Sequence, residues 1–138
     1  MININHEENM RYTELIERKI FFSGKPIEVT IDPKASATCK LVDVDVPALD
    51  AAFSKETDFY VGPGGSGGIG KRYVRFADFI ANSNTVEASM VYVDEIGRVS
   101  FDNGRHRFAF FRDNGIKTMP VSMTPESITN ATKFGYIK

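Results

Sequence analysis

The stretch FDNGRHRFAFFRDNGIKTMPV, from Phe101 to Val121, carries the clearest fold signals in the chain. Its centre predicts a helix of about ten residues that is capped by Asp102 or Asn103. The helix should stop at Asn114-Gly115, because these two residue types tolerate the left-handed conformation that ends many helices. The following KTMPVSM segment predicts a short strand, so this stretch indicates a strand, a helix and a second strand.

Working outward, the remaining segments alternate between strand and helix signals. KIFFSGKPIEVTI (19–31) predicts two strands joined at Ser23-Gly24-Lys25-Pro26, CKLVDVDV (39–46) predicts a half-buried strand, and SMVYVDEIGRVSF (89–101) predicts a strand pair. PALDAAFSK (47–55), the segment after Gly70 and TPESITNAT (124–132) predict helices, the last with Thr124 as N-cap and Pro125 in its first turn. The order indicates an α+β domain rather than a regular βαβ repeat.

Length and composition fit one domain spanning residues 1–138, with residues 1–12 frayed or in a short helix and residues 62–71 forming a glycine-rich loop. The formal net charge of -1 argues against a broad electrostatic grip on DNA or acidic lipids. The single cysteine, Cys39, excludes an internal disulfide, and the two histidines have no metal-ligand spacing. With no long apolar run and no signal-peptide core, we expect a cytoplasmic protein.

Three basic or titratable residues, Arg105, His106 and Arg107, follow Gly104 at the predicted helix start. A helix N-terminus carries free N–H groups and partial positive charge, so cations there oppose the helix dipole unless an anion is bound. Gly104 would let a ligand approach the backbone, and the two arginines could bind phosphate oxygens. The structural alternative is that Asp102 caps the helix and pairs with Arg105, Arg112 pairs with an acid such as Asp113, and His106 is a satisfied ring.

The stretch DNGRHRFAFFRDNGIKTMPV resembles the conserved element of the ParB/sulfiredoxin superfamily, in which Gly-x-x-Arg opens a helix and the chain returns through a Gly-hydrophobic and a Pro-Val pair. The resemblance implies a compact mixed-sheet domain with helices around a small sheet, in a stand-alone bacterial member. It also implies that Gly104, Arg105, His106 and Arg107 bind nucleotide phosphates. Arg105 replaces the reactive cysteine of sulfiredoxins, and Arg-His-Arg replaces the Glu-Arg-Arg of partition proteins, so neither of those two activities is expected.

The loop GPGGSGGIGK adds a second basic helix start, with Lys71, Arg72 and Arg75. Gly65, Gly67, Gly68, Lys71 and Arg72 are therefore predicted to bind the same ligand, with the loop closing over it. The loop matches G-x-x-x-x-G-K and G-x-G-x-x-G, but Arg72 stands where a phosphate-loop ATPase has Ser or Thr, so neither fold is expected. The alternative is a disordered loop followed by a solvated surface helix.

Three functional hypotheses follow. The first is binding of a nucleotide or another phosphorylated ligand, with hydrolysis or phosphoryl transfer if Asp94 or Asp102 holds the Mg²⁺ of a nucleoside triphosphate and His106 acts as acid or base. We expect a hairpin to bring Asp94 close to Asp102. The second is a ParB-like metal-dependent nuclease, which the near-neutral charge disfavours. The third is a non-catalytic interaction or inhibitor protein of a mobile element. We predict no dedicated protein metal site, and expect Asp43 and Asp45 to share a solvated strand face.

Overall fold

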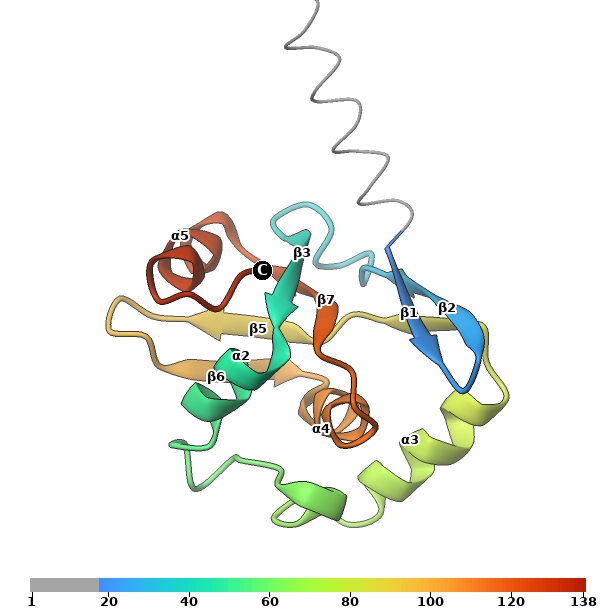
Figure 1. Ribbon diagram of the computed structural model, residues 1–138. Helices are drawn as coiled ribbons and strands as arrows, with labels where there is room; N and C mark the ends of the chain where they lie inside the picture. The colour runs from blue at the N-terminus through green and yellow to red at the C-terminus, as the bar shows by residue number, and fades with distance from the viewer. Residues whose placement is uncertain (1–17) are drawn as a thin grey trace, which may run out of the picture.

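Two small sheets form the framework of the protein, and helices surround them (Figure 1). The computed structural model describes residues 18–138, and the prediction for residues 1–12 lies outside this range. Within it, four α-helices, one 3-10 helix and two mixed sheets confirm the α+β class. None of these helices is both long enough and apolar enough to cross a membrane.

The smaller sheet has the strand order β1-β2-β4 and begins with the predicted hairpin. β1 (Lys19–Phe22) and β2 (Lys25–Thr30) pair in antiparallel fashion around Ser23 and Gly24. Both turn residues have positive φ, 52° and 77°, which matches the twist that a two-residue hairpin requires. β4 (Thr85–Glu87) joins β2 in parallel. The sequence did not predict β4, because three residues give no measurable alternation.

The larger sheet has the order β3-β7-β5-β6 and contains the three remaining predicted strand segments. β3 (Lys40–Asp45) runs antiparallel to β7 (Thr118–Met123), and β5 (Met90–Val93) runs parallel to β7. β6 (Val99–Asn103) completes the hairpin with β5 and forms the edge. The chain therefore leaves the edge strand β6, forms a helix, and returns as the central strand β7.

The helices begin and end close to the predicted positions. α2 (Val46–Phe53) has Pro47 in its first turn and is capped by Asp45, which accepts a hydrogen bond from the Ala48 amide at 3.3 Å. α5 (Pro125–Lys133) is capped by Thr124, as predicted, through the Ser127 amide at 3.2 Å. η1 (Pro63–Gly65) lies within the glycine loop, and α3 (Arg72–Ala81) follows that loop.

The cap of α4 (Arg105–Asp113) differs from the prediction. Neither Asp102 nor Asn103 caps the helix, because the strand pairing of β6 continues through Asn103 opposite Met90. Gly104 is the N-cap, with φ of 81° and no side-chain cap hydrogen bond. A Cβ at Gly104 would lie 2.6 Å from the Ser89 Oγ, so only glycine fits this turn. The predicted end at Asn114-Gly115 is confirmed.

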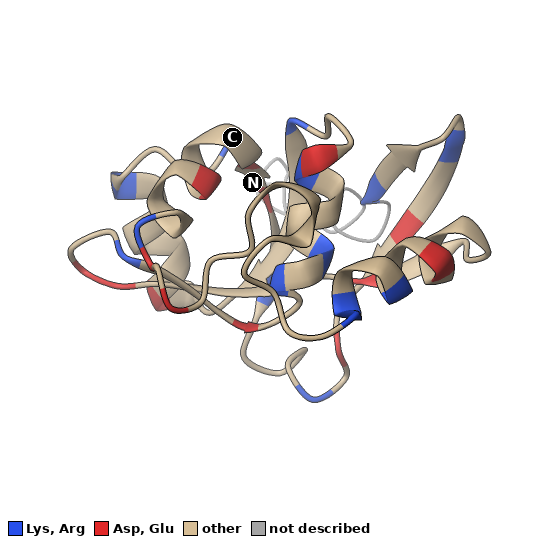
Figure 2. Ribbon diagram, turned by 90° about the horizontal axis from the view of Figure 1, so that it is seen from below, with Lys and Arg blue, Asp and Glu red and all other residues tan. Residues whose placement is uncertain are grey.

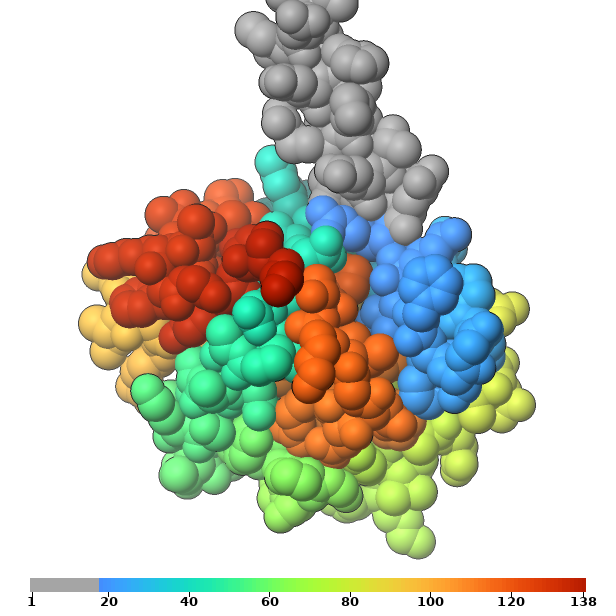
Figure 3. Space-filling model, viewed as in Figure 1, coloured from blue at the N-terminus to red at the C-terminus, as the bar shows by residue number. Residues whose placement is uncertain are grey.

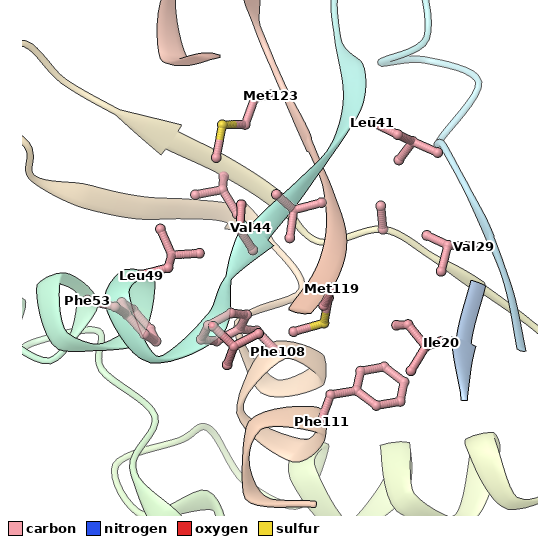
Figure 4. Packing of buried hydrophobic residues seen from close by; sticks show 14 of the residues in the cluster. Ile20, Val29, Leu41, Val44, Leu49, Phe53, Phe108, Phe111, Met119 and Met123 are labelled. Carbon is pink, nitrogen blue, oxygen red and sulfur yellow. The ribbon is translucent and has the colours of Figure 1, made fainter. Parts of the chain in front are cut away.

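The phenylalanines of α4 fix the helix against the core (Figure 4). Phe108 is fully buried and packs edge-on against Phe53 of α2, with ring centroids 6.2 Å apart. Phe111 is 2% exposed and packs against Phe22 of β1. Each such burial contributes roughly 1.5–3 kcal/mol. Because the helix is anchored to both sheets, its N-terminal turn has a fixed position at the surface.

Candidate functional site

A pocket of about 630 Å³ lies between α3, the end of β6 and the first turn of α4. We call it the α3–α4 pocket. It brings together the two basic helix starts, which are about 30 residues apart in the sequence. Its lining residues are Ile69, Arg72, Arg75, Phe76, Phe79, Phe101, Asp102, Asn103, Gly104, Arg105, His106 and Arg107.

Four arginines line this pocket: Arg72, Arg75, Arg105 and Arg107. Among residues 18–138, ion pairs within 4.0 Å involve Arg18, Arg98 and Arg112, and none involves the pocket arginines. Asp102 is the only acidic residue in the lining. Seen from below, the basic segments of α3 and α4 lie next to each other (Figure 2). The pocket therefore concentrates positive charge in a chain of net charge -1.

Arg107 is the most enclosed of these arginines. Its Nη2 donates to the Ala88 carbonyl at 3.4 Å and to the Asn103 Oδ1 at 3.2 Å. Its Nε is buried and has no hydrogen-bond partner in the described part of the chain. Burial lowers the pKa of Arg107, and the charge of Glu87 opposes this effect only in part. A guanidinium stays charged in proteins, so this side chain lacks the anion that would normally accompany a partly buried arginine.

Arg105 and the helix start add to the same field. The Arg105 guanidinium lies over the exposed ring of Phe59, 5.8 Å from its centroid, which is a cation–π contact. Because Gly104 has no side chain, no side-chain cap satisfies the first N–H groups of α4. These groups carry the positive end of the helix dipole. Side chains and backbone therefore both favour an anion here.

Aromatic side chains also line the pocket. Phe76 and Phe79 of α3 have ring centroids 5.9 Å apart, and Phe79 is 53% exposed. Phe101 contributes from β6. Sequence reasoning named Arg75 only as part of the second basic helix start, and it did not name Phe79 or Phe101 as site residues. Arg75 and Phe79 follow Arg72 at helical spacing, so the periodicity of α3 could have predicted that they share a face with Arg72.

The glycine loop is folded against α4, which does not fit the alternative of a disordered loop (Figure 3). The Gly62 amide donates to the Ser66 carbonyl at 2.7 Å, and the Gly64 amide donates to the Asp113 Oδ2 at 2.9 Å. Tyr73 also donates to this carboxylate oxygen, at 2.6 Å. The part of the loop around Gly64 is thus held at the C-terminal end of α4.

Most of the loop residues that we predicted to bind the ligand lie outside the pocket. A Cβ at Gly65 would lie 2.7 Å from the Tyr73 ring, and one at Gly67 would lie 2.8 Å from the Tyr60 carbonyl oxygen. A Cβ at Gly68 would lie 2.9 Å from the His106 ring. These glycines permit close packing of the loop, and neither they nor Lys71 line the pocket. Of the five residues that we predicted in this segment, Arg72 alone faces the site.

His106 is buried, at 8% exposure, and makes a specific contact with the loop. Its Nε2 accepts a hydrogen bond from the Ile69 amide at 2.9 Å. An accepting Nε2 carries no proton, so the neutral tautomer has its proton on Nδ1. Burial, together with the charges of Arg105 and Arg72, lowers the pKa of His106. His106 therefore matches the structural alternative, in which the buried ring is hydrogen-bonded within the protein.

The candidate acids do not meet. Asp94 accepts from the Ile96 and Arg98 amides at 3.0 and 2.8 Å, which closes the turn between β5 and β6. Asp102 lies at the other end of this hairpin, so the expectation that the hairpin brings the two carboxylates together is wrong. Among the residues that the structure describes, no group of three His, Cys, Asp or Glu side chains could hold a metal ion.

The two strand acids of β3 have structural partners. Asp43 forms an ion pair with Arg18, and Asp45 caps α2. Three aromatic residues in or near the glycine loop, Tyr60, Tyr73 and Phe76, have two different roles. Tyr60 packs against Phe53 with a centroid distance of 5.0 Å, and Tyr73 packs against Phe110, whereas Phe76 lines the pocket.

Comparison with known proteins shows a likeness of fold. No protein-family model and no curated protein matches the chain. Among solved structures, it is similar to Oncogenic Suppression Activity Protein, a plasmid fertility inhibition factor solved as a gold(I) cyanide derivative. The TM-score is 0.64 at 17% sequence identity, covering 87% of this chain and 67% of the other. At this identity the two proteins share an α+β fold, which does not by itself fix function.

Proposed function

We propose that the protein binds a nucleotide or another phosphorylated ligand in the α3–α4 pocket. The observation that carries this proposal is the set of four pocket arginines without a carboxylate partner among residues 18–138. Cations gathered in this way repel one another, and an anion between them removes that cost. Arginine binds phosphate oxygens through two parallel hydrogen bonds, so a phosphate fits this arrangement well.

The arginines and the aromatic rings of the pocket suit different parts of such a ligand. Arg105, Arg107 and the backbone N–H groups at the start of α4 would bind phosphate oxygens, with Arg72 and Arg75 facing them from α3. The exposed ring of Phe79 offers a stacking surface for a base. A nucleotide can use both the arginines and the aromatic ring, whereas inorganic phosphate can use only the arginines. We therefore expect nucleotides to bind more tightly than phosphate alone.

Membership of the ParB/sulfiredoxin superfamily is part of the same proposal. It is supported by the position of the Gly104 turn, which follows strand β6 and opens α4 before the chain returns as β7. The phosphate-binding role that the resemblance implies for Arg105 and Arg107 fits their place in the pocket lining. Action in the cytoplasm, where nucleotides are abundant, belongs to this proposal as well.

The proposal covers binding first and reaction second. If a nucleoside triphosphate enters with Mg²⁺, Asp102 is the carboxylate in the pocket lining, and Mg²⁺ needs few protein ligands when phosphates and water supply the others. Asp94 is occupied at the distant turn. The acceptor atom of His106 is occupied by Ile69, so a role as general base requires the loop to move first.

A thermal-shift screen of nucleotides and pyrophosphate, with and without Mg²⁺, tests the binding proposal. A ligand present at about 100 times its dissociation constant should stabilise the wild type by roughly 2.7 kcal/mol. Arg107→Ala should lose this shift. Arg98→Ala is the matched control, because Arg98 pairs with Glu56 outside the pocket and should keep the shift. If no phosphorylated compound shifts the wild type, the proposal fails.

A second candidate is that the protein is an inhibitor of plasmid transfer. The likeness in fold to a plasmid fertility inhibition factor favours it. The test is conjugation frequency from donor cells that express the chain. We expect transfer to fall if the candidate is correct, and an unchanged frequency would count against it. The Arg105→Ala variant asks whether inhibition depends on the pocket.

A further inference from the structure

The hydrogen bond between Ile69 and His106 sets the position of α3 as well as that of the loop. The Ile69 amide donates to the His106 Nε2, and the Ile69 carbonyl accepts from the Arg72 amide at 3.2 Å. The Arg75 amide donates to the Lys71 carbonyl at 2.8 Å in the same turn. A short chain of hydrogen bonds thus links the first turn of α4 to the first turn of α3. Ile69, His106 and Arg72, which form these bonds, all line the α3–α4 pocket.

The contact leaves little freedom for the ring. His106 is 8% exposed, and a Cβ at Gly68 would lie 2.9 Å from its Cδ2 and Nε2 atoms. The backbone of Gly68 and Ile69 therefore lies directly against the imidazole edge that carries the acceptor. A proton on Nε2 would turn the acceptor into a donor that faces the Ile69 N–H. Two donors cannot share this close contact, so the loop would have to move.

We propose that His106 is a positioning residue of the pocket: its neutral imidazole holds Ile69, and so keeps Arg72 and Arg75 at the ligand, until a proton on Nε2 releases the loop. The ligand part of this inference rests on the proposed function. The loop part does not, because the Ile69 contact exists without any ligand.

The surroundings of His106 decide the pH range. Burial first, and then the charges of Arg105 on its own helix and Arg72 on α3, disfavour the imidazolium, so the pKa is lowered from 6.5. The loop residues that touch the ring, Gly68 and Ile69, do not titrate. Asp102, from β6, is the acid that lines the same pocket. The contact is therefore intact at neutral pH and opens only below the ordinary pKa of histidine.

The second attachment of the loop does not titrate in this range. The Gly64 amide and the Tyr73 hydroxyl both donate to Asp113, whose pKa is lowered despite its burial, by these two bonds and by Arg112. The pKa of Tyr73 is raised to about 12. Between about pH 5 and pH 7.5, the proton of His106 is thus the one that separates the two loop states.

The first test follows the Ile69 amide by hydrogen exchange, expressed as a protection factor at about pH 5 and about pH 7.5. In the wild type we expect protection to fall at least about tenfold at the lower pH. His106→Gln retains an acceptor oxygen but cannot titrate, and its protection should not depend on pH. Wild-type protection that is equal at both pH values would overturn the proposal, whatever the variant does.

The second test asks whether the contact positions Arg72, with pyrophosphate as the probe. Arg72→Ala should weaken pyrophosphate binding about tenfold at pH 7.5, but less than about threefold at pH 5, where the loop is already released. An equal penalty at both pH values would overturn the positioning role. If pyrophosphate does not bind the wild type at either pH, the proposed function fails, and the exchange test still decides the loop part on its own.

Discussion

The two ends of helix α4 carry the same residue type in opposite situations. At the C-terminal end, Arg112 donates to Asp50 at 2.9 Å, to Asp113 at 3.0 Å and to the Val61 carbonyl at 2.7 Å. At the N-terminal end, Arg105 and Arg107 have no carboxylate partner in the described chain. In sequence the three arginines are equivalent members of one basic helix. Their partners separate a structural arginine from candidate ligand-binding ones.

This difference explains why charge patterning alone was ambiguous. The alternative reading paired Arg105 with Asp102 and Arg112 with Asp113. The structure confirms the second pair and not the first. A paired arginine stabilises the fold, whereas an unpaired one at a helix N-terminus costs stability until an anion is bound. The comparison therefore predicts opposite effects for the same substitution at the two ends.

The largest expected effect is on stability. Arg112→Met leaves Asp50 and Asp113 without their cation, and should lower the free energy of unfolding by about 2–3 kcal/mol. Arg107→Met removes a charge that has no acidic partner, and should change it by less than about 1 kcal/mol, toward greater stability. Urea unfolding of both variants measures this. Equal losses at both ends would break the comparison.

The next effect concerns charge within the pocket. Arg75→Glu places a carboxylate among the remaining pocket arginines, where it can act as an internal substitute for the anion. We expect ATP affinity to fall more than about tenfold, with stability unchanged or raised by about 0.5 kcal/mol. Calorimetric titration gives the affinity, and Arg98→Glu is the charge-matched control outside the pocket. Undiminished affinity would place the ligand elsewhere.

A smaller effect is expected where the loop meets the C-terminal end of α4. Tyr73→Phe removes the hydrogen bond to Asp113 and should cost about 1 kcal/mol. Burial, followed by Asp113, raises the pKa of Tyr73 to about 12. The folded state thus favours the neutral phenol, so this contribution is present below the ordinary pKa of 10.0 and is lost as the pH rises toward 12. Ultraviolet titration should lose its highest tyrosine step in the variant, and an unchanged titration curve would contradict the assignment.

The smallest effects separate the two acids of the β5–β6 hairpin. Asp94→Ala should cost about 1 kcal/mol, through the lost turn, and leave ligand binding unchanged. Asp102→Ala should change stability by less than about 0.5 kcal/mol but abolish any Mg²⁺ dependence of nucleotide binding.

Plasmid nicking with divalent metals, measured on the same variants, tests the nuclease hypothesis. The nuclease hypothesis requires that the wild type cleaves the plasmid and that Asp102→Ala abolishes this cleavage. A plasmid that stays intact with every common divalent metal would contradict the hypothesis.

Local signals in the sequence were enough for most elements. Ser23-Gly24 marked the first hairpin, Thr124 and Pro125 marked the start of α5, and Asn114-Gly115 marked the end of α4. Each of these boundaries depends on the conformational preferences of a few adjacent residues, so the local sequence is sufficient to predict it. The α+β class follows from the order of these elements.

Contacts between distant segments decided the rest. The sequence by itself determined that two basic helix starts exist, but only the tertiary structure decided that both face one pocket, since their convergence depends on packing α3 beside α4. It likewise decided that Gly104 rather than Asp102 caps α4, through the nearby Ser89, and that His106 holds Ile69. Arg112 binds Asp50 and the Val61 carbonyl, which are 62 and 51 residues away in the sequence, and no local preference encodes such contacts.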